Sequence, residues 1–199
     1  MFGDEPPPSG IRMADRLGTV PAVKFDGERW QTNRTIARGL ERVRPDPPLF
    51  PADPELRRQV EEAERWGDEV LQMAARRIAL AAVMHGPDAL VDRANDGPLG
   101  PLLWHSERLR FAGTRFLARY TFRARLRDEP ELLDALPPML DRIDAWIDAG
   151  VLNSDALNAA DFMIVTSLAL LSYRRDLHDE IRSRPGGDMV DRILPASAA

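Results

Sequence analysis

Apolar residues recur every three or four positions through the middle of the chain, beginning at Leu56. The members of this stripe are Leu56, Val60, Ala63, Gly67, Val70, Ala74, Ile78 and Ala81. Because this spacing follows one face of an α-helix, it predicts a continuous helix over Leu56–Ala81. The acidic residues between them fall off the stripe, and we expect them to face solvent. These acidic residues are Glu61, Glu62, Glu64 and Asp68.

The segment Asn158–Leu171 is apolar on nearly every side, which predicts the buried central helix of a bundle with Phe162 in its core. Asn158 stands at the helix start, and Asp161 follows three positions later. This spacing is close to a capping box, in which each side chain accepts a hydrogen bond from the backbone of the other residue. We therefore interpret Asn158 and Asp161 as structural capping residues and assign Asp161 no catalytic or metal role.

Other helices are expected from the same periodicity and from their end signals. A second long helix should cover about Leu99–Arg125. Pro137-Pro138 opens a helix over Pro138–Ala149, which Gly150 terminates. Two shorter helices, Asp176–Arg184 and Asp188–Ile193, should complete a bundle made of these elements. The fold class is therefore mainly α.

The region before the bundle has a different pattern. Residues 20–25 suit a short strand, Asp26-Gly27 is a preferred pair for a tight hairpin turn, and Arg29–Gln31 suits the returning strand. Asn33 is the expected cap of a helix that is apolar at Ile36, Leu40 and Val43. The next segment, Arg44–Pro54, holds five prolines and reads as an extended linker. We place the domain boundary there.

Composition limits the possible functions. The 199-residue chain has 44% hydrophobic and 30% charged residues, as in a globular protein, and a formal net charge of -5. This charge argues against binding of nucleic acid or anionic membrane. The chain has no cysteine, hence no disulfide, thiolate metal site or cysteine nucleophile. An acidic, proline-rich start and the lack of a long apolar run lead us to expect a cytoplasmic protein.

Two groups of side chains, three histidines and four arginines, are of residue types that bind metals or anions. The histidines His85, His105 and His178 stand apart without a ligand motif, so we expect no metal. Four arginines share one side of the second long helix. They are Arg108, Arg115, Arg119 and Arg123. They form either an anion-attracting wall or, as we favour, a solvated edge that pairs with acidic residues of neighbouring helices.

Three short motifs, in this order and spacing, resemble the glutathione transferase family over about Gly18–Pro195. They are Thr19-Val20-Pro21 before the hairpin, Thr32-Asn33-Arg34-Thr35-Ile36 at the start of the next helix, and LNAADF at 157–162. The resemblance implies a partial thioredoxin-like, glutathione-binding domain (1–44), the proline-rich linker (45–54) and an all-helical C-terminal domain (55–199). It also implies a homodimer, to which the open edges of the hairpin add a physical reason.

The same resemblance implies a site for glutathione, the co-substrate. Val20 and a cis Pro21 would pair with its extended backbone, and Thr32 and Asn33 would contact its γ-glutamyl carboxylate. For Asn33, capping alone is the alternative.

The family's catalytic Tyr, Ser or Cys lies in a first strand–helix turn that the residues before Pro21 do not match, so the catalytic residue is unknown. We expect conjugation of glutathione to an electrophilic small molecule if that domain is completed. The alternative is a non-catalytic interaction or structural module.

Overall fold

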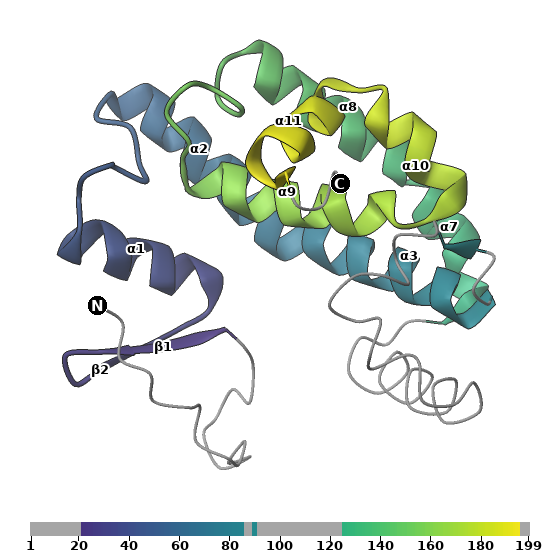
Figure 1. Ribbon diagram of the computed structural model, residues 1–199, viewed down its shortest axis with the longest axis horizontal. Helices are drawn as coiled ribbons and strands as arrows, with labels where there is room; N and C mark the ends of the chain where they lie inside the picture. The colour runs from purple at the N-terminus through teal and green to yellow at the C-terminus, as the bar shows by residue number, and fades with distance from the viewer. Residues whose placement is uncertain (1–20, 86–88, 91–124, 196–199) are drawn as a thin grey trace. The chain divides into compact units, whose positions relative to one another are not determined.

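The computed structural model describes residues 21–85, 89–90 and 125–195 (Figure 1). Apart from one hairpin and one isolated β-bridge, the regular elements of these residues are helices, which confirms the mainly α prediction. The chain divides into two compact units, one up to Pro45 and one from Asp46 onward. The helix predicted over Leu99–Arg125 lies outside the described residues except for Arg125. His105 and the four arginines at 108, 115, 119 and 123 lie outside them as well.

The first unit begins with the predicted hairpin. Strands β1 (Ala22–Phe25) and β2 (Glu28–Gln31) pair antiparallel, with Ala22 opposite Gln31 and Phe25 opposite Glu28. The two turn residues, Asp26 and Gly27, have φ angles of 46° and 80°. A type I′ turn needs positive φ at both central positions, which an Asp-Gly pair adopts readily. The hairpin prediction is therefore confirmed.

Helix α1 (Asn33–Val43) follows directly, but its cap differs from the prediction. The N-cap is Thr32, whose hydroxyl accepts a hydrogen bond from the Thr35 backbone N–H at 3.3 Å. Asn33 is instead the first helical residue, so its assignment as the cap was wrong. Both residue types cap well, and the periodicity of the sequence does not fix a helix start to one residue.

Helix α1 packs on the hairpin through a close contact at Gly39. A Cβ atom there would lie 2.4 Å from the Trp30 ring, so only glycine permits this approach. Phe25 stacks on Trp30 with ring centroids 5.6 Å apart, and the Arg42 guanidinium lies 5.7 Å from the Trp30 ring centroid. Trp30 and Gly39 are the buried residues of the described part of this unit, while Leu40 on the apolar stripe of α1 stays exposed.

In the second unit the predicted long stripe forms a helical run that is interrupted by a π-helical turn. Helix α2 (Pro54–Trp66) leads through the turn Gly67–Leu71 into α3 (Gln72–His85). Val70, expected inside, is 40% exposed, whereas Leu71 is fully buried. A π-turn takes one more residue per turn than an α-helix. The inward position after Gly67 therefore falls on the fourth residue instead of the third.

One acidic residue of the same run also departs from the prediction. Glu64 is 1% exposed, although it was expected in solvent with its neighbours. It lies four residues after Val60 and three before Gly67, both buried, and so belongs to the edge of the inward face. Glu61, Glu62 and Asp68 are partly exposed.

Helix α9 (Ala159–Ser172) is the centre of the second unit, as predicted. It contacts α2 and α3 on one side and α10 (Arg175–Arg182) and α11 (Pro185–Ile193) on another (Figure 1). Its exposed positions are Phe162 and Thr166, one turn apart. Phe162 is 45% exposed, so its assignment to the core was wrong. An almost uniformly apolar helix gives no sign of which narrow stripe is left uncovered.

The remaining helices and the linker complete the second unit. A short 3₁₀ turn (Leu126–Asp128) and α7 (Glu129–Asp134) precede α8 (Leu136–Asp148), which starts two residues before the predicted Pro138. The end of the proline-rich segment packs into this unit as well. The Leu49 carbonyl accepts a hydrogen bond from the Ala159 N–H at 2.9 Å, and Phe50 is buried.

Candidate functional site

The open end of the hairpin brings together the described members of the predicted glutathione site. Because Ala22 pairs with Gln31, the residues just outside this pair, Pro21 and Thr32, lie at the same end of the hairpin. Asn33 follows as the first residue of α1. Val20 lies outside the described residues, and so does the geometry of its bond to Pro21.

Thr32 has an unusual backbone at this place. Its φ of 80° and ψ of 147° put a β-branched residue in a region that is normally left to glycine. Such a conformation costs about 1–3 kcal/mol, and strain of this kind concentrates at functional sites. The Thr32 hydroxyl is engaged locally, with its oxygen 3.1 Å from the Thr35 hydroxyl oxygen. Thr32 is also exposed, so an external molecule can reach it.

The electrostatics at the start of α1 favour an anion. The first turn holds no acidic residue, and a helix N-terminus carries partial positive charge. The N-terminus of a helix therefore favours binding of a carboxylate group. Residues 21–45 contain no Tyr, Ser or Cys, the residue types that the resemblance leads us to expect for activation of the thiol.

The capping pair at α9 forms the geometry expected of a capping box. The Asn158 side-chain oxygen accepts from the Ala160 and Asp161 N–H groups, and Asp161 accepts from the Asn158 N–H at 2.8 Å. Asp161 also accepts from the Asn153 N–H at 2.7 Å. Burial raises the pKa of Asp161, although the two backbone hydrogen bonds oppose the shift. These contacts make the pair structural.

An ionic cluster built on the buried Arg174–Glu129 pair joins three helices of the second unit and was not predicted. The side chains of its other members, Asp176 and His85, are about half exposed. The Arg174 guanidinium contacts Glu129 at 2.6 Å and both carboxylate oxygens of Asp176 at 2.7 and 2.9 Å. His85 approaches the other Glu129 oxygen at 2.6 Å. Burial lowers the pKa of Arg174, but the bonds to Asp176 and Glu129 outweigh it and raise the value. Because the members are up to 91 residues apart in the sequence (His85 to Asp176), no local motif reveals the cluster.

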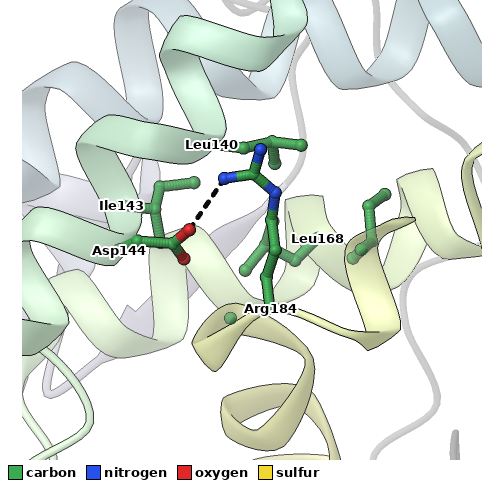
Figure 2. Close-up of a pocket in the computed structure, with 7 residues that line it drawn as sticks. Leu140, Ile143, Asp144, Leu168 and Arg184 are labelled. Carbon is green, nitrogen blue, oxygen red and sulfur yellow. Dashed lines mark hydrogen bonds and ion pairs between the residues drawn. The ribbon is translucent and has the colours of Figure 1, made fainter. Parts of the chain in front are cut away.

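A small pocket lies between α8, α9 and the start of α11 (Figure 2). Leu140 and Leu168 line it, and Gly186 allows close approach, since a Cβ there would lie 3.0 Å from Leu168 Cδ1. Figure 2 shows the Arg184 guanidinium directed toward Asp144, and the two groups are 2.8 Å apart. The space is too small for a ligand, so this pocket is a packing feature closed by an ion pair.

Comparison with known proteins gave no match: neither the family models, nor the curated proteins, nor the solved structures contain a significant relative of this chain. Within the described ranges, no group of three or more His, Cys, Asp and Glu side chains is arranged to hold a metal ion. No described helix is both long and apolar enough to cross a membrane.

Proposed function

We propose that this chain is a glutathione-transferase-like protein whose first unit holds the γ-glutamyl end of glutathione at Thr32 and Asn33. The observation that carries the proposal is the strained Thr32 at an anion-favouring helix start, opposite Pro21 at the open end of the hairpin. In this arrangement Pro21 and Val20 would lie along the peptide backbone of the tripeptide. The first turn of α1 would hold its carboxylate.

The second unit supports the same proposal through its architecture. A capped, buried central helix surrounded by other helices is what the resemblance leads us to expect of a transferase C-terminal domain. Conjugation requires in addition that the glutathione thiol be deprotonated, because the thiolate is the nucleophile. A group that lowers the thiol pKa must then come from outside residues 21–45, and the reaction partner would be an electrophilic small molecule.

The alternative function is a non-catalytic interaction or structural module, and one observation favours it. Three large apolar side chains of the first unit, Phe25, Leu40 and Val43, are more than 40% exposed. Exposed apolar groups of this size are common at protein–protein interfaces. If the protein is such a module, the strained Thr32 binds no ligand.

Binding of glutathione tests the proposal directly. The start of α1 is exposed to solvent, which screens a charge contact, so we expect weak, saturable binding with Kd of about 1 mM. In ¹H–¹⁵N spectra the amides of residues 32–36 should shift. Asn33→Ala should weaken binding several-fold, whereas Lys24→Ala, exposed on β1 of the same unit, should leave it unchanged. Unshifted amides at 32–36 with about 10 mM glutathione would reject the site.

A second variant separates ligand binding from folding. Thr32→Gly removes the backbone strain, so the first unit should gain up to about 1–3 kcal/mol in stability. Part of this gain is offset by the lost hydroxyl cap, for which glycine substitutes at a cost of a few tenths of a kcal/mol. If Thr32 serves glutathione, the same variant should bind it more weakly despite the greater stability. If the affinity for glutathione is unchanged, the backbone strain at Thr32 plays no role in binding.

Residues 21–45 hold no Tyr, Ser or Cys, so we expect no catalysis unless another part of the chain activates the thiol. Without a group that stabilises the thiolate, the bound thiol keeps its reference pKa of about 8.5 and little of it reacts at neutral pH. We therefore expect conjugation of an aromatic halide at the uncatalysed rate only. A rate above background in the present chain would place a thiol-activating group within it.

A further inference from the structure

Two tryptophans and an arginine connect α2 to α8 in the second unit. Trp66 is the last residue of α2, and Trp146 lies in the last turn of α8. Their rings meet edge to face with centroids 5.3 Å apart, and both residues are partly buried. The Arg142 guanidinium lies over both rings, 5.2 Å from the Trp66 centroid and 4.5 Å from the Trp146 centroid. Both distances are shorter than roughly 6 Å, the range within which an aromatic ring attracts a cation.

The contact of Arg142 with the rings is stronger than its ion pair. Arg142 also donates a hydrogen bond to Glu62 on α2 at 3.0 Å. The side chains of Arg142 and Glu62 are 43% and 39% exposed, and an ion pair so open to water is weak and is screened by salt. Glu62 is also shared with Arg58, whose Nη1 lies 3.7 Å away. The two partly buried rings are less affected by salt, so they make the lasting part of the contact.

Trp146 also takes part in the turn that ends α8. Its carbonyl accepts hydrogen bonds from the Val151 N–H at 2.9 Å and from the Leu152 N–H at 3.2 Å. Gly150, with a φ of 71°, donates to the Ile147 carbonyl at 2.9 Å. These bonds form the Schellman motif, in which a glycine with positive φ ends a helix. Because Val151 and Leu152 are both buried, the chain is held in place where it leaves α8.

The loop after this turn supplies the cap of the central helix α9. The Val151 carbonyl accepts a hydrogen bond from the Asn158 side chain at 2.9 Å. Two residues after Val151, the Asn153 N–H donates to Asp161, the buried carboxylate that also accepts from the Asn158 N–H. One continuous series of contacts thus leads from α2 through the end of α8 to the start of α9.

We propose that Arg142 is a latch that holds the end of α8 to α2 through the two tryptophan rings and so positions the loop 150–158 that caps α9. When the guanidinium leaves the rings, α8 keeps its packing on α7 and α11, but its end is no longer held to α2. The loop and the cap then open more readily than the rest of the second unit.

Two double-mutant cycles in urea unfolding at about 0.5 M NaCl test the latch. The first pairs Arg142→Ala with Trp146→Leu, and the second pairs Arg142→Ala with Glu62→Gln. Arg142→Ala should raise the unfolding constant about 3- to 10-fold more in the wild-type chain than in Trp146→Leu, the size of a partly desolvated cation–π contact. The second cycle should give less than about twofold, because salt screens the exposed ion pair. Coupling below about twofold in the first cycle would overturn the proposal.

Native-state amide hydrogen exchange tests whether the latch positions the loop. The reporters are the amides of Asn153 and Asn158, which donate to the buried carboxylate, and the reference amides are those of residues 177–182 in α10. Relative to this reference, the reporters should exchange about 3- to 10-fold faster in Arg142→Ala than in the wild-type chain. Arg127→Ala, whose native side chain is 72% exposed, is the control and should leave the ratio unchanged. An unchanged ratio in Arg142→Ala would overturn the positioning role. Neither experiment involves glutathione, so the proposed function is tested separately.

Discussion

Individual side chains in this protein stabilise backbone groups that water cannot reach. At the start of α9, Asp161 is fully buried and accepts hydrogen bonds from two backbone N–H groups, those of Asn153 and Asn158. A helix start that is buried needs such acceptors, because its first N–H groups have no partner within the helix. The carboxylate thus couples the start of α9 to the loop after α8. Asp161 can play this role because each of its two carboxylate oxygens accepts one of these hydrogen bonds.

Replacing Asp161 by asparagine should disturb this arrangement. One carboxylate oxygen becomes an NH₂ group, which cannot accept, so one buried backbone N–H loses its partner. We expect Asp161→Asn to lower the free energy of unfolding by about 1–3 kcal/mol at neutral pH, measured by urea denaturation. Asp155→Asn, an exposed acidic residue in the same loop, is the control and should change it by less than about 0.5 kcal/mol. Equal losses in both variants would contradict the capping role.

The pH dependence of the same variant tests the state of the buried carboxyl. Burial raises the pKa of Asp161 above that of an unfolded chain, where aspartate titrates near about 3.9. The stabilisation from protonation is therefore complete below about pH 3.9 and is lost as the pH rises through the raised folded value. Relative to Asp161→Asn, the wild-type chain should gain stability as the pH falls from about 6 to about 4. A constant difference between the two proteins would mean that the pKa is not raised.

Whole elements show how backbone geometry alters a regular pattern. The π-turn Gly67–Leu71 joins α2 to α3 and turns Val70 outward and Leu71 inward. On the far side of the turn the stripe resumes with Ala74 and Ile78, both buried. The turn thus acts as a change of register within one long helical run. It explains why a stripe drawn at constant spacing is right on both sides of the turn and wrong inside it.

Alanine substitutions on the two faces of this turn should differ in cost. Leu71→Ala removes a fully buried side chain and should lower the free energy of unfolding by about 2–5 kcal/mol. Val70→Ala affects a half-exposed residue and should cost less than about 1 kcal/mol. Phe162→Ala, exposed on α9, should be similarly mild. Denaturant melts of the three variants check the order, and a larger loss for Val70→Ala than for Leu71→Ala would mean that the turn is α-helical.

The molecule as a whole consists of two units that bury their side chains to different degrees. The second unit has an extensive apolar core around α9, including Ile164, Leu168 and Leu171. The described part of the first unit buries Trp30 and Gly39 and pairs only two strands. A two-stranded hairpin is marginally stable by itself. Contact with further protein would therefore stabilise the first unit.

We propose a homodimer as the source of this contact. Among the described residues of the first unit, the exposed apolar side chains and the unpaired edges of the two-stranded hairpin are features that association would bury. Light scattering at tens of micromolar should then give twice the mass of one chain. Leu40→Glu places a charge on the exposed stripe of α1 and should shift the mass toward the monomer, whereas Leu126→Glu, exposed in the second unit, should not. A monomeric wild-type chain at this concentration would contradict the proposal.

The sequence alone determined those features that depend on residues close together in the chain. The Asp-Gly turn, the start of the central helix at Asn158 and the mainly helical character all follow from local propensity and from spacing over a few residues. The three motifs that resemble the transferase family are local too. They predicted a glutathione site at Val20, Pro21, Thr32 and Asn33, and this site stays a prediction.

Only the tertiary structure decided which side chains share an environment. Glu64 is buried because its helix face meets other helices, and Phe162 is exposed because no described neighbour covers its stripe of α9. His85, Glu129 and Arg174 meet although 44 and 45 residues separate them along the chain. Burial and charge pairing depend on the packing of distant segments, and a local pattern holds no information about that packing.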